Sequence, residues 1–434
     1  MLLLARQSVQ APAAPVLRVQ SPRTYANSSG ERALPPLTFD EHGTFQLSIF
    51  GDLHFGENAW DQWGPQQDLA SLNVMRAVLD AESPQLVVLN GDLITGENAY
   101  LENSTSYIDR IVSPLVARGL SWASTYGNHD HNFNLSARDM LAREKRFPGS
   151  RTRSMVQGRS AGVTNYYLLV FGPECGHDTG ARCAPELILW FFDSRGGHYY
   201  RKRTPDGRQV GQPDWVDTSV VDWFRQTNAE MRASYGRTIP SLAFVHIPTN
   251  ASLALQQDGQ GGIDPNHQPG VNDDSPLAQQ GQGWCPDGRD DGTCEYGAQD
   301  VPFMHALATT PGLIALFSGH DHGDSWCSKW DRLVPGMTVA GNGVNLCFGG
   351  HSGYGGYGNW IRGARQVRLS RRKLWEAETW IRRESGSAVG KVTLNTTYGK
   401  DWYPAVPNDR TSCPTCDYTK ITPGPRGRSL RGPG

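Results

Sequence analysis

Short apolar runs that end in polar clusters recur along the chain, at residues 44–50, 85–90, 119–126, 241–246 and 313–318. The first run alternates apolar and polar positions, which is typical of a half-buried strand. The runs 85–90 and 313–318 are almost entirely apolar, as buried strands of parallel sheets are. Four of the five are followed directly by glycine, which marks a tight turn. We therefore predict five strands that deliver polar side chains at their carboxyl ends.

Segments with helical spacing of apolar residues lie between these strands. Residues 68–79 place five apolar side chains on one face, and Ser83-Pro84 ends this helix before the next strand. Further helices are predicted over residues 104–115, 137–146, 219–234 and 302–309. Ser136 is expected to cap the second of these. The strand–helix–strand order predicts a parallel sheet and an α/β fold.

Other segments predict antiparallel pairing. Residues 164–171 and 186–193 flank a loop with two cysteines and are expected to form a hairpin. Residues 337–348, 365–369 and 374–381 alternate like strands of a second, more antiparallel sheet. The Gly-Tyr-Gly-Gly-Tyr-Gly stretch at 353–358 lacks the strand-to-helix setting of a phosphate loop, so we predict a structural loop near the site.

Composition divides the chain into three parts. Residues 1–36 are rich in Pro, Ala, Ser and Arg without periodicity and predict a flexible leader, residues 37–400 predict the folded domain, and 401–434 predict a Cys-containing, Pro/Gly/Arg-rich tail. Residues 255–299 form a Gln-, Gly- and Asp-rich insertion, which is too long for a plain connection and predicts either disorder or a functional lid. Its Asp-rich run resembles a calcium loop only faintly, because Arg289 and Ala298 stand at ligand positions.

Charge and hydropathy exclude some partners. The chain has 434 residues with 41 Lys+Arg against 43 Asp+Glu, so no global basic field favours nucleic acid or an anionic membrane. No run approaches the roughly 18 apolar residues that a membrane-spanning helix needs. The apolar start at residues 1–5 is too short for the core of a signal peptide. The sequence does not predict an oligomeric state.

Cysteines and glycosylation triplets favour an oxidising compartment. The eight cysteines are Cys175, Cys183, Cys285, Cys294, Cys327, Cys347, Cys413 and Cys416. The local pairs 175/183 and 285/294 fit disulfides better than a metal site, and 413/416 fits a loop disulfide or free thiols better than a redox motif or half a zinc site. Acceptor triplets begin at Asn27, Asn103, Asn134, Asn250 and Asn395. We therefore expect a disulfide-bonded glycoprotein that is secreted, vacuolar or elsewhere in the secretory pathway.

The polar residues at the strand ends form a candidate metal site. They are Asp52, His54, Asp92, Asn128, His129, His246, His320 and His322. Ligands gather outside the carboxyl ends of strands in α/β sheets, so these side chains are expected to converge. Alone, the stretch 127–131 would be an ordinary polar turn and His246 a structural histidine. Together, converging carboxylates and imidazoles are costly to bury without a cation. Their oxygen and nitrogen donors suit Fe, Mn, Zn or Mg, and their number suggests two ions.

At these positions the chain resembles the calcineurin-like metallophosphoesterase superfamily. Its motifs are Asp-x-His, Gly-Asp, Gly-Asn-His-Asp/Glu, a lone His and Gly-His-x-His. They stand here as Asp52-Leu-His54, Gly91-Asp92, Gly127-Asn-His-Asp130, His246 and Gly319-His-Asp-His322, in family order within residues 44–322. The sequence resembles fungal Dcr2-type phosphatases and plant purple-acid-phosphatase-like proteins that carry Asp-x-His first.

The resemblance implies a four-layer αββα sandwich of two mixed sheets flanked by helices, with a dinuclear centre. One ion would take Asp52, His54 and His322, the other would take Asn128, His246 and His320, and Asp92 would bridge them. The ions would activate a water as hydroxide for in-line attack on phosphorus. His129 would act as acid toward the leaving oxygen, held by Asp130. Asp321, between two ligands, would be either a support for the centre or merely structural.

The resemblance leaves the metal pair and the reaction partly open. Purple enzymes place a Tyr where this chain has Thr95 and lack a His at the position of His54, so Fe/Zn, Mn or di-Zn ions are expected without a purple chromophore. The implied function is a phosphatase acting on phosphoproteins or small phosphate esters, with phosphomonoesters favoured. A phosphodiesterase of the same superfamily and a catalytically silent binding or scaffold protein are the alternatives.

Overall fold

Two mixed sheets and six helices carry the fold, which the computed structural model describes over residues 34–158, 160–175, 183–259 and 261–416. The six-stranded sheet has the order β15 (Ala388–Leu394), β14 (Ala377–Arg383), β13 (Gly363–Ser370), β2 (Thr44–Phe50), β3 (Leu86–Asn90) and β4 (Trp122–Thr125). Its strands β2, β3 and β4 are parallel, whereas β13, β14 and β15 join as antiparallel neighbours.

The seven-stranded sheet has the order β1 (Leu37–Thr38), β5 (Tyr166–Phe171), β6 (Leu187–Phe192), β9 (Ser241–Val245), β10 (Leu313–Ser318), β12 (Val344–Phe348) and β11 (Cys327–Trp330). Strands β6, β9, β10 and β12 run parallel. The expected hairpin is present as the antiparallel pair β5–β6. A separate two-stranded ribbon consists of β7 (His198–Arg203) and β8 (Gln209–Gly211).

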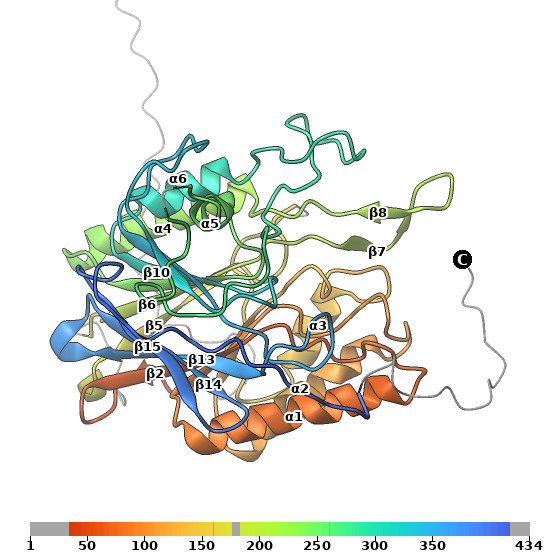
Figure 1. The fold of residues 1–434 in the computed structure, drawn as a ribbon, viewed down its shortest axis with the longest axis horizontal. Helices are drawn as coiled ribbons and strands as arrows, with labels where there is room; N and C mark the ends of the chain where they lie inside the picture. The colour runs from red at the N-terminus through yellow and green to blue at the C-terminus, as the bar shows by residue number, and fades with distance from the viewer. Residues whose placement is uncertain (1–33, 159, 176–182, 260, 417–434) are drawn as a thin grey trace, which may run out of the picture. The chain divides into compact units, whose positions relative to one another are not determined.

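Helices cover the outer face of each sheet. The helices α1 (Trp63–Ala81), α2 (Tyr107–Ala117) and α3 (Ala137–Glu144) share a buried apolar cluster with the six-stranded sheet. The helices α4 (Thr218–Tyr235), α5 (Asn250–Gln256) and α6 (Val301–Thr309) share another with the seven-stranded sheet. Short 3₁₀ turns occupy Ser104–Ser106, Pro173–Cys175 and Arg371–Lys373. A third cluster joins the two sheets, so the layers are helix, sheet, sheet and helix (Figure 1), as expected.

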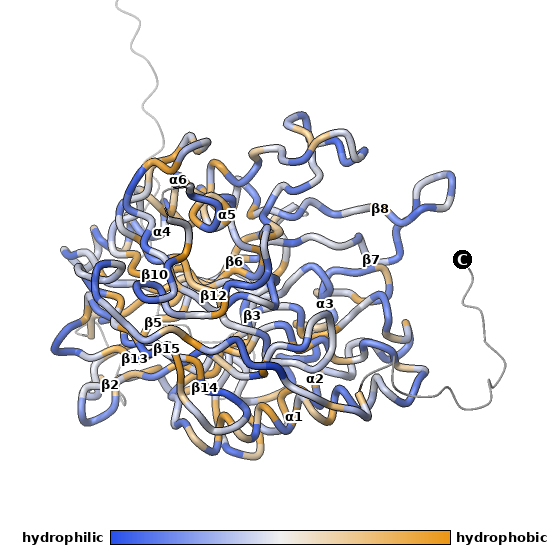
Figure 2. The backbone as a smooth tube through the Cα atoms, viewed as in Figure 1, coloured by the Kyte–Doolittle hydropathy of each residue, from blue (hydrophilic) through white to orange (hydrophobic). Residues whose placement is uncertain are grey.

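Strand β3 shows why its sequence is apolar throughout. Leu86 and Val88 lie in the cluster between the sheets, whereas Val87 and Leu89 lie in the cluster under the helices. Successive side chains of a strand point to opposite faces, and both faces are covered here. Figure 2 shows such apolar stretches in orange on the strands, with polar segments in blue on the connecting loops.

The C-terminal strands depart from the prediction of a separate antiparallel sheet. Strand β12 extends the seven-stranded sheet beside β10, whereas β13 and β14 extend the six-stranded sheet beside β2. Alternation of apolar residues identifies a strand but not the strand with which it pairs. The parallel strands of each sheet left an open edge on which a further strand could pair. Strands β7, β8, β11 and β15 were not predicted.

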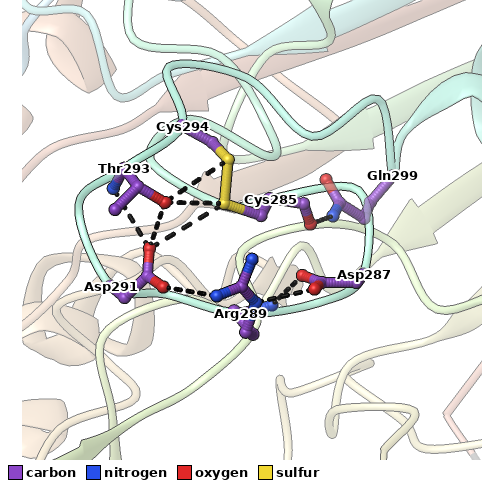
Figure 3. The surroundings of a disulfide bond; sticks show 7 residues. All are labelled: Cys285, Asp287, Arg289, Asp291, Thr293, Cys294 and Gln299. Carbon is purple, nitrogen blue, oxygen red and sulfur yellow. Dashed lines mark hydrogen bonds and ion pairs between the residues drawn. A yellow bond between two sulfur atoms is a disulfide. The ribbon is translucent and has the colours of Figure 1, made fainter.

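The insertion begins two residues later than predicted, because Leu255 and Gln256 end α5. Residues 257–299, of which 260 lies outside the described residues, contain no helix or strand where described. In its Asp-rich loop, Arg289 bonds to both Asp287 and Asp291 beside the Cys285–Cys294 disulfide (Figure 3). The arginine thus pairs with two of the carboxylates of this run.

All eight cysteines are paired. The disulfides are Cys175–Cys183, Cys285–Cys294, Cys327–Cys347 and Cys413–Cys416. The two predicted local pairs are therefore present, and Cys327–Cys347 links directly opposite residues of β11 and β12. In the described part of the chain, every helix is too short or too polar to cross a bilayer. The predicted leader and tail fall mostly on residues 1–33 and 417–434, outside the described residues, so the domain boundaries stay predictions.

A buried carboxylate fixes the strand that leads into the predicted site. Glu144, at the end of α3, accepts hydrogen bonds of 2.9 Å each from Trp122 Nε1, Ser124 Oγ and Tyr126 OH. Thr152 and Ser150 also donate to it. Burial raises the pKa of Glu144, and the donated hydrogen bonds oppose that rise.

We expect Glu144→Ala to destabilise the fold by about 3 kcal/mol or more, because it leaves several buried donors without an acceptor. Chemical denaturation measures this loss. Glu144→Gln, which keeps one acceptor oxygen, should lose less, and Glu230→Ala on the exposed side of α4 should change stability by less than about 0.5 kcal/mol. Equal stability of the Glu144→Ala and Glu230→Ala variants would contradict the anchoring role.

Candidate metal centre

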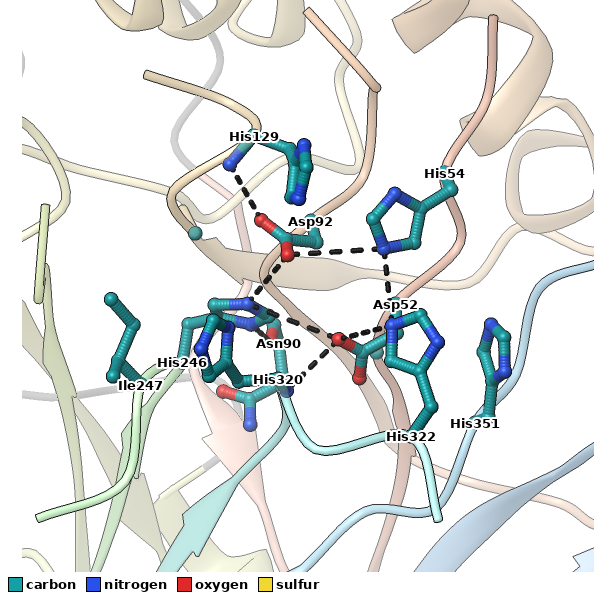
Figure 4. Close-up of polar contacts among 12 residues, drawn as sticks. Asp52, His54, Asn90, Asp92, His129, His246, Ile247, His320, His322 and His351 are labelled. Carbon is teal, nitrogen blue, oxygen red and sulfur yellow. Dashed lines mark hydrogen bonds and ion pairs between the residues drawn. The ribbon is translucent and has the colours of Figure 1, made fainter. Parts of the chain in front are cut away.

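The carboxyl ends of five strands meet at one place. Asp52 and His54 follow β2, Asp92 follows β3, Asn128 and His129 follow β4, His246 follows β9, and His320 and His322 follow β10. Figure 4 shows the imidazoles of His54, His246, His320 and His322 turned toward the carboxylates of Asp52 and Asp92. The strand ends of both sheets thus contribute, as the sequence predicted from the parallel order.

Four of these residues have unusual backbone conformations. The φ angles are 55° at Asp52, 47° at His54, 48° at Asp92 and 76° at His320, in the left-handed region that non-glycine residues rarely adopt. Such conformations cost on the order of 1–3 kcal/mol each and persist where surrounding structure imposes them. Here they turn the side chains out of the strand ends and into one cluster.

Two groups of potential ligand atoms lie side by side. The first consists of Asp52, His54 and His322, with 3.2 Å between the Nε2 atoms of the two histidines and 3.6 Å from His322 Nε2 to Asp52 Oδ1. The second consists of Asp92, His246 and His320, with 2.9 Å from His246 Nε2 to Asp92 Oδ2. Within each group the ligand atoms lie within 4.8 Å of one another.

Asp92 connects the two groups. Its Oδ2 lies 2.9 Å from His246 Nε2 in the second group and 3.8 Å from His54 Nε2 in the first. A third, overlapping group consists of His54, Asp92 and His129. Ligands about 2.1 Å from one ion stand roughly 3–3.5 Å apart, so the separations in the two groups are close to those of coordinating atoms.

Hydrogen bonds at the far nitrogen orient three of the imidazoles. His54 Nδ1 is 3.0 Å from Thr95 Oγ1, His246 Nδ1 is 2.9 Å from the Asn90 carbonyl, and His322 Nδ1 is 2.8 Å from the Tyr357 carbonyl. A protein acceptor at Nδ1 fixes the tautomer that leaves the Nε2 lone pair facing the cluster. This arrangement is typical of histidines that bind metals.

The electrostatics of the cluster fit bound cations. Burial lowers the pKa of His54 and of His320 to about 3, so both imidazoles are neutral with free lone pairs at neutral pH. Burial also raises the pKa of Asp52 to about 7. Asn128 Oδ1 is buried and has no hydrogen-bond partner among the described residues. Burial lowers the pKa of His246, but the charges of Asp92 and Asp52 outweigh it and raise the pKa to about 9. Imidazoles, carboxylates and an amide oxygen, without thiolate, suit Fe, Mn or Zn ions.

His129 lies at the edge of this cluster. Its backbone N–H donates to Asp92 Oδ1 at 2.8 Å, and its Nδ1 lies 2.5 Å from Glu97 Oε1. Burial lowers the pKa of His129, but the charges of Asp92 and Glu97 outweigh it and raise the pKa to about 10. With 31% of its side chain exposed, His129 can reach a molecule bound from solvent.

Asp130 contacts the backbone instead of the His129 ring. Its carboxylate accepts hydrogen bonds from the N–H groups of Leu93 at 3.0 Å, Ile94 at 3.0 Å and Gly127 at 2.9 Å. It therefore ties the Asp92 turn to the Asn128–His129 turn. The expectation that Asp130 holds His129 stays a prediction: the carboxylate bonds to these backbone donors of the turn, whereas Glu97 contacts the His129 ring from a neighbouring loop.

Two glutamates of the site were missed by the sequence analysis. Besides Glu97, Glu57 Oε2 accepts from Thr95 Oγ1 at 2.6 Å and so supports the hydroxyl that contacts His54. Both glutamates lie in loops without apolar periodicity. No pattern in the sequence marks them, and only the packing of the loops brings them to the site.

The glycine-rich loop 353–358 lies against the centre, as predicted. The Tyr357 ring stacks on His322 with 4.0 Å between ring centroids. A Cβ atom at Gly356, whose φ is +72°, would lie 2.5 Å from His322 Cε1, so only glycine fits there. The insertion also touches the centre's loops, because the Ala278 N–H donates to Asp321 Oδ1 at 2.8 Å. Asp321 thus holds the insertion through one oxygen of its carboxylate.

Sequence comparison agrees with this geometry. Residues 46–324, which span all five strand-end motifs, match the family described as calcineurin-like phosphoesterase. The chain is 27% identical over 376 residues to "Probable inactive purple acid phosphatase 29" of Arabidopsis thaliana, covering 80% of this chain and 84% of that protein. It is 25% identical over 323 residues to "Phosphatase DCR2" of Saccharomyces cerevisiae, covering 71% of this chain and 48% of the yeast protein.

Among solved structures, a dimetal phosphatase from Danio rerio aligns with 81% of this chain and 98% of its own, at 11% identity and a TM-score of 0.44. The match to the sequence family is more informative, because it covers well over half of the chain and contains every motif whose side chains converge in the site. The chain belongs to the calcineurin-like phosphoesterase family.

Proposed function

We propose that this protein is a metal-dependent phosphatase that hydrolyses phosphoric esters, with phosphomonoesters favoured, at the cluster described above. The observation that carries the proposal is the pair of ligand groups joined through Asp92, with the partly exposed His129 beside them. The substrate would be a phosphoprotein or a small phosphate ester.

In this proposal the chain holds two divalent or trivalent ions, from Fe, Zn or Mn. Asp52, His54 and His322 hold one, Asn128, His246 and His320 hold the other, and Asp92 serves both. When bound, such ions supply charge stabilisation for a transferring phosphoryl group and an activated water nucleophile. The unpartnered Asn128 oxygen supports the assignment of Asn128 to the second group.

His129 would act as the acid of the reaction. Its Nδ1 is engaged by Glu97, which leaves the Nε2–H to donate to the leaving oxygen of the ester. Asp130 would act as a positioning residue, since its backbone contacts fix the turn that carries His129. Glu97 would hold the imidazolium charged and oriented.

A catalytically silent binding protein on the same fold is the second candidate. Three relatives of this chain bear the name "Probable inactive purple acid phosphatase", which favours it. Against it, every implied ligand and His129 are present, whereas loss of ligands would be the signature of a silent centre.

We also propose residence in the secretory pathway or outside the cell. The four disulfides of the structure support an oxidising compartment. The asparagines of the acceptor triplets would carry glycans there. One of them, Asn103, is exposed. Glycosidase treatment of protein purified from its native source would reveal such glycans as a mass shift.

We expect about two metal ions per chain by mass spectrometry of the purified protein, and turnover of p-nitrophenyl phosphate that a chelator abolishes. Turnover of the bis(p-nitrophenyl) ester under the same conditions separates the two esterase classes, because a phosphodiesterase would prefer it. Apoprotein treated with chelator and then resupplied with Fe, Zn or Mn serves as the control. Absence of both stoichiometric metal and turnover would favour the silent binding protein.

A further inference from the structure

The β7–β8 ribbon is a basic arm on an otherwise slightly acidic protein. Residues 198–211 contain four basic residues and one acidic residue, a charge of +3 within a chain whose net charge is -2. The basic residues are Arg201, Lys202, Arg203 and Arg208, and all four are exposed. Tyr200 is also exposed, at 43%. The ribbon projects away from the two sheets (Figure 1).

The arm starts directly at the turn that carries Asn128 and His129. A Cβ at Gly196 would lie 2.7 Å from Asn128 Cβ, and one at Gly197 would lie 2.2 Å from the Asn128 carbonyl oxygen. These glycines let the base of the arm pack tightly on that turn. The His198 N–H then donates to the His131 carbonyl at 2.8 Å. A chain bound along the arm would therefore lead to the metal centre.

The arm is braced where it leaves the site. The Arg201 N–H donates to the Phe133 carbonyl at 3.1 Å, and the Arg203 guanidinium lies 4.4 Å from the centroid of the Phe133 ring. Arg208 pairs with Asp206. Arg201 and Lys202 form no ion pair with any described residue, and the Lys202 ammonium lies 4.8 Å from the centroid of the Tyr199 ring. Two cations without a carboxylate partner, on an arm that starts at the Asn128–His129 turn, form an anion-attracting surface.

The insertion that contacts the loops of the centre is acidic in composition. The insertion at residues 257–299 contains seven Asp and one Glu against one Arg, and it touches the centre through Asp321. A polyphosphate chain such as a nucleic acid, which is anionic along its whole length, would be repelled on that side. A polypeptide with a short acidic stretch on only one side of its phosphate ester can place that stretch on the basic arm and keep it away from the acidic insertion.

We propose that the β7–β8 arm binds an acidic segment next to a phosphorylated residue, so that the substrate of this centre is an acidic phosphoprotein. This inference rests on the proposed phosphatase function. Arg201 and Lys202 supply specificity through the affinity for the substrate, and they take no part in the chemistry.

The test compares two synthetic phosphoserine peptides that differ only in carrying Glu or Gln at four flanking positions. At low salt, the wild-type protein should show a KM about 5- to 10-fold lower for the Glu peptide than for the Gln peptide. Two exposed charge pairs can supply a difference in affinity of this size. Arg201→Gln/Lys202→Gln should remove this preference and leave turnover of p-nitrophenyl phosphate unchanged. The matched control is Arg225→Gln/Arg232→Gln on exposed positions of α4, which should keep the preference.

Three results would overturn the proposal: equal KM values for both peptides in the wild type, an unchanged preference in Arg201→Gln/Lys202→Gln, or equally strong competition by a single-stranded oligonucleotide. Fluorescence anisotropy with a labelled Glu peptide that carries a non-hydrolysable phosphonate measures binding without turnover. Binding that depends on the arm in a protein that turns over no ester would refute the phosphatase function alone. Turnover without arm-dependent binding would refute this inference alone.

Discussion

Asp92→Asn is expected to lower turnover of p-nitrophenyl phosphate by on the order of 10³-fold and to lower the metal content of the purified protein. The Asp92 carboxylate belongs to the second ligand group, at 2.9 Å from His246 Nε2, and also lies 3.8 Å from His54 Nε2 of the first. The substitution keeps the shape but removes the charge that both ions would share. Changes to residues that merely orient metal ligands cost about 10–100-fold, so loss of the shared ligand should cost more.

The control for Asp92→Asn is Asp321→Asn. Asp321 is also a buried carboxylate beside the centre, but its Oδ1 accepts from the Ala278 N–H of the insertion. We expect the Asp321 variant to keep both ions and to lose less than about tenfold in turnover. Thermal unfolding of both variants checks that the fold survives. If both variants lost activity and metal equally, the central place of Asp92 in the proposed centre would be untenable.

The ligand cluster was predictable because strand order places it. Asp52, Asp92, His246 and His320 each follow a strand that the apolar pattern identified, and parallel strands present their carboxyl ends along one edge. The family resemblance implied that the carboxyl ends of the strands of both sheets meet, and they do so in the fold. Which of these residues hold ions stays a prediction for the metal and mutant experiments to test.

The remaining features were hidden from the sequence for physical reasons. Alternation reveals a strand only when one face is buried, and the β7–β8 ribbon exposes most of its residues. Glu57 and Glu97 reach the site through the packing of two loops, which no local pattern encodes. The sequence also does not reveal that the Asp130 carboxylate accepts from three backbone donors, because such contacts depend on how the two turns pack.

Substitution of His129 is expected to cause the second large loss of activity. We expect His129→Gln to lower kcat by about 10²–10⁴-fold, the usual range for a lost general acid, with little change in KM and with both ions retained. Glu97→Gln should lower kcat by a smaller factor, because the imidazole would lose the partner 2.5 Å from its Nδ1 but keep its Nε2–H. Steady-state kinetics and metal analysis on the same preparations measure these effects.

The leaving group separates an acid from a structural residue. p-Nitrophenolate leaves readily without protonation, whereas an alkyl phosphate needs a proton on its departing oxygen, so His129→Gln should impair hydrolysis of the alkyl ester far more. A purely structural role would slow both esters by the same factor. Because His129 also belongs to a group with His54 and Asp92 that could hold a metal, loss of one ion from His129→Gln would instead make His129 a ligand. The ratio of the two rates, read with the metal count, therefore assigns the residue to one role.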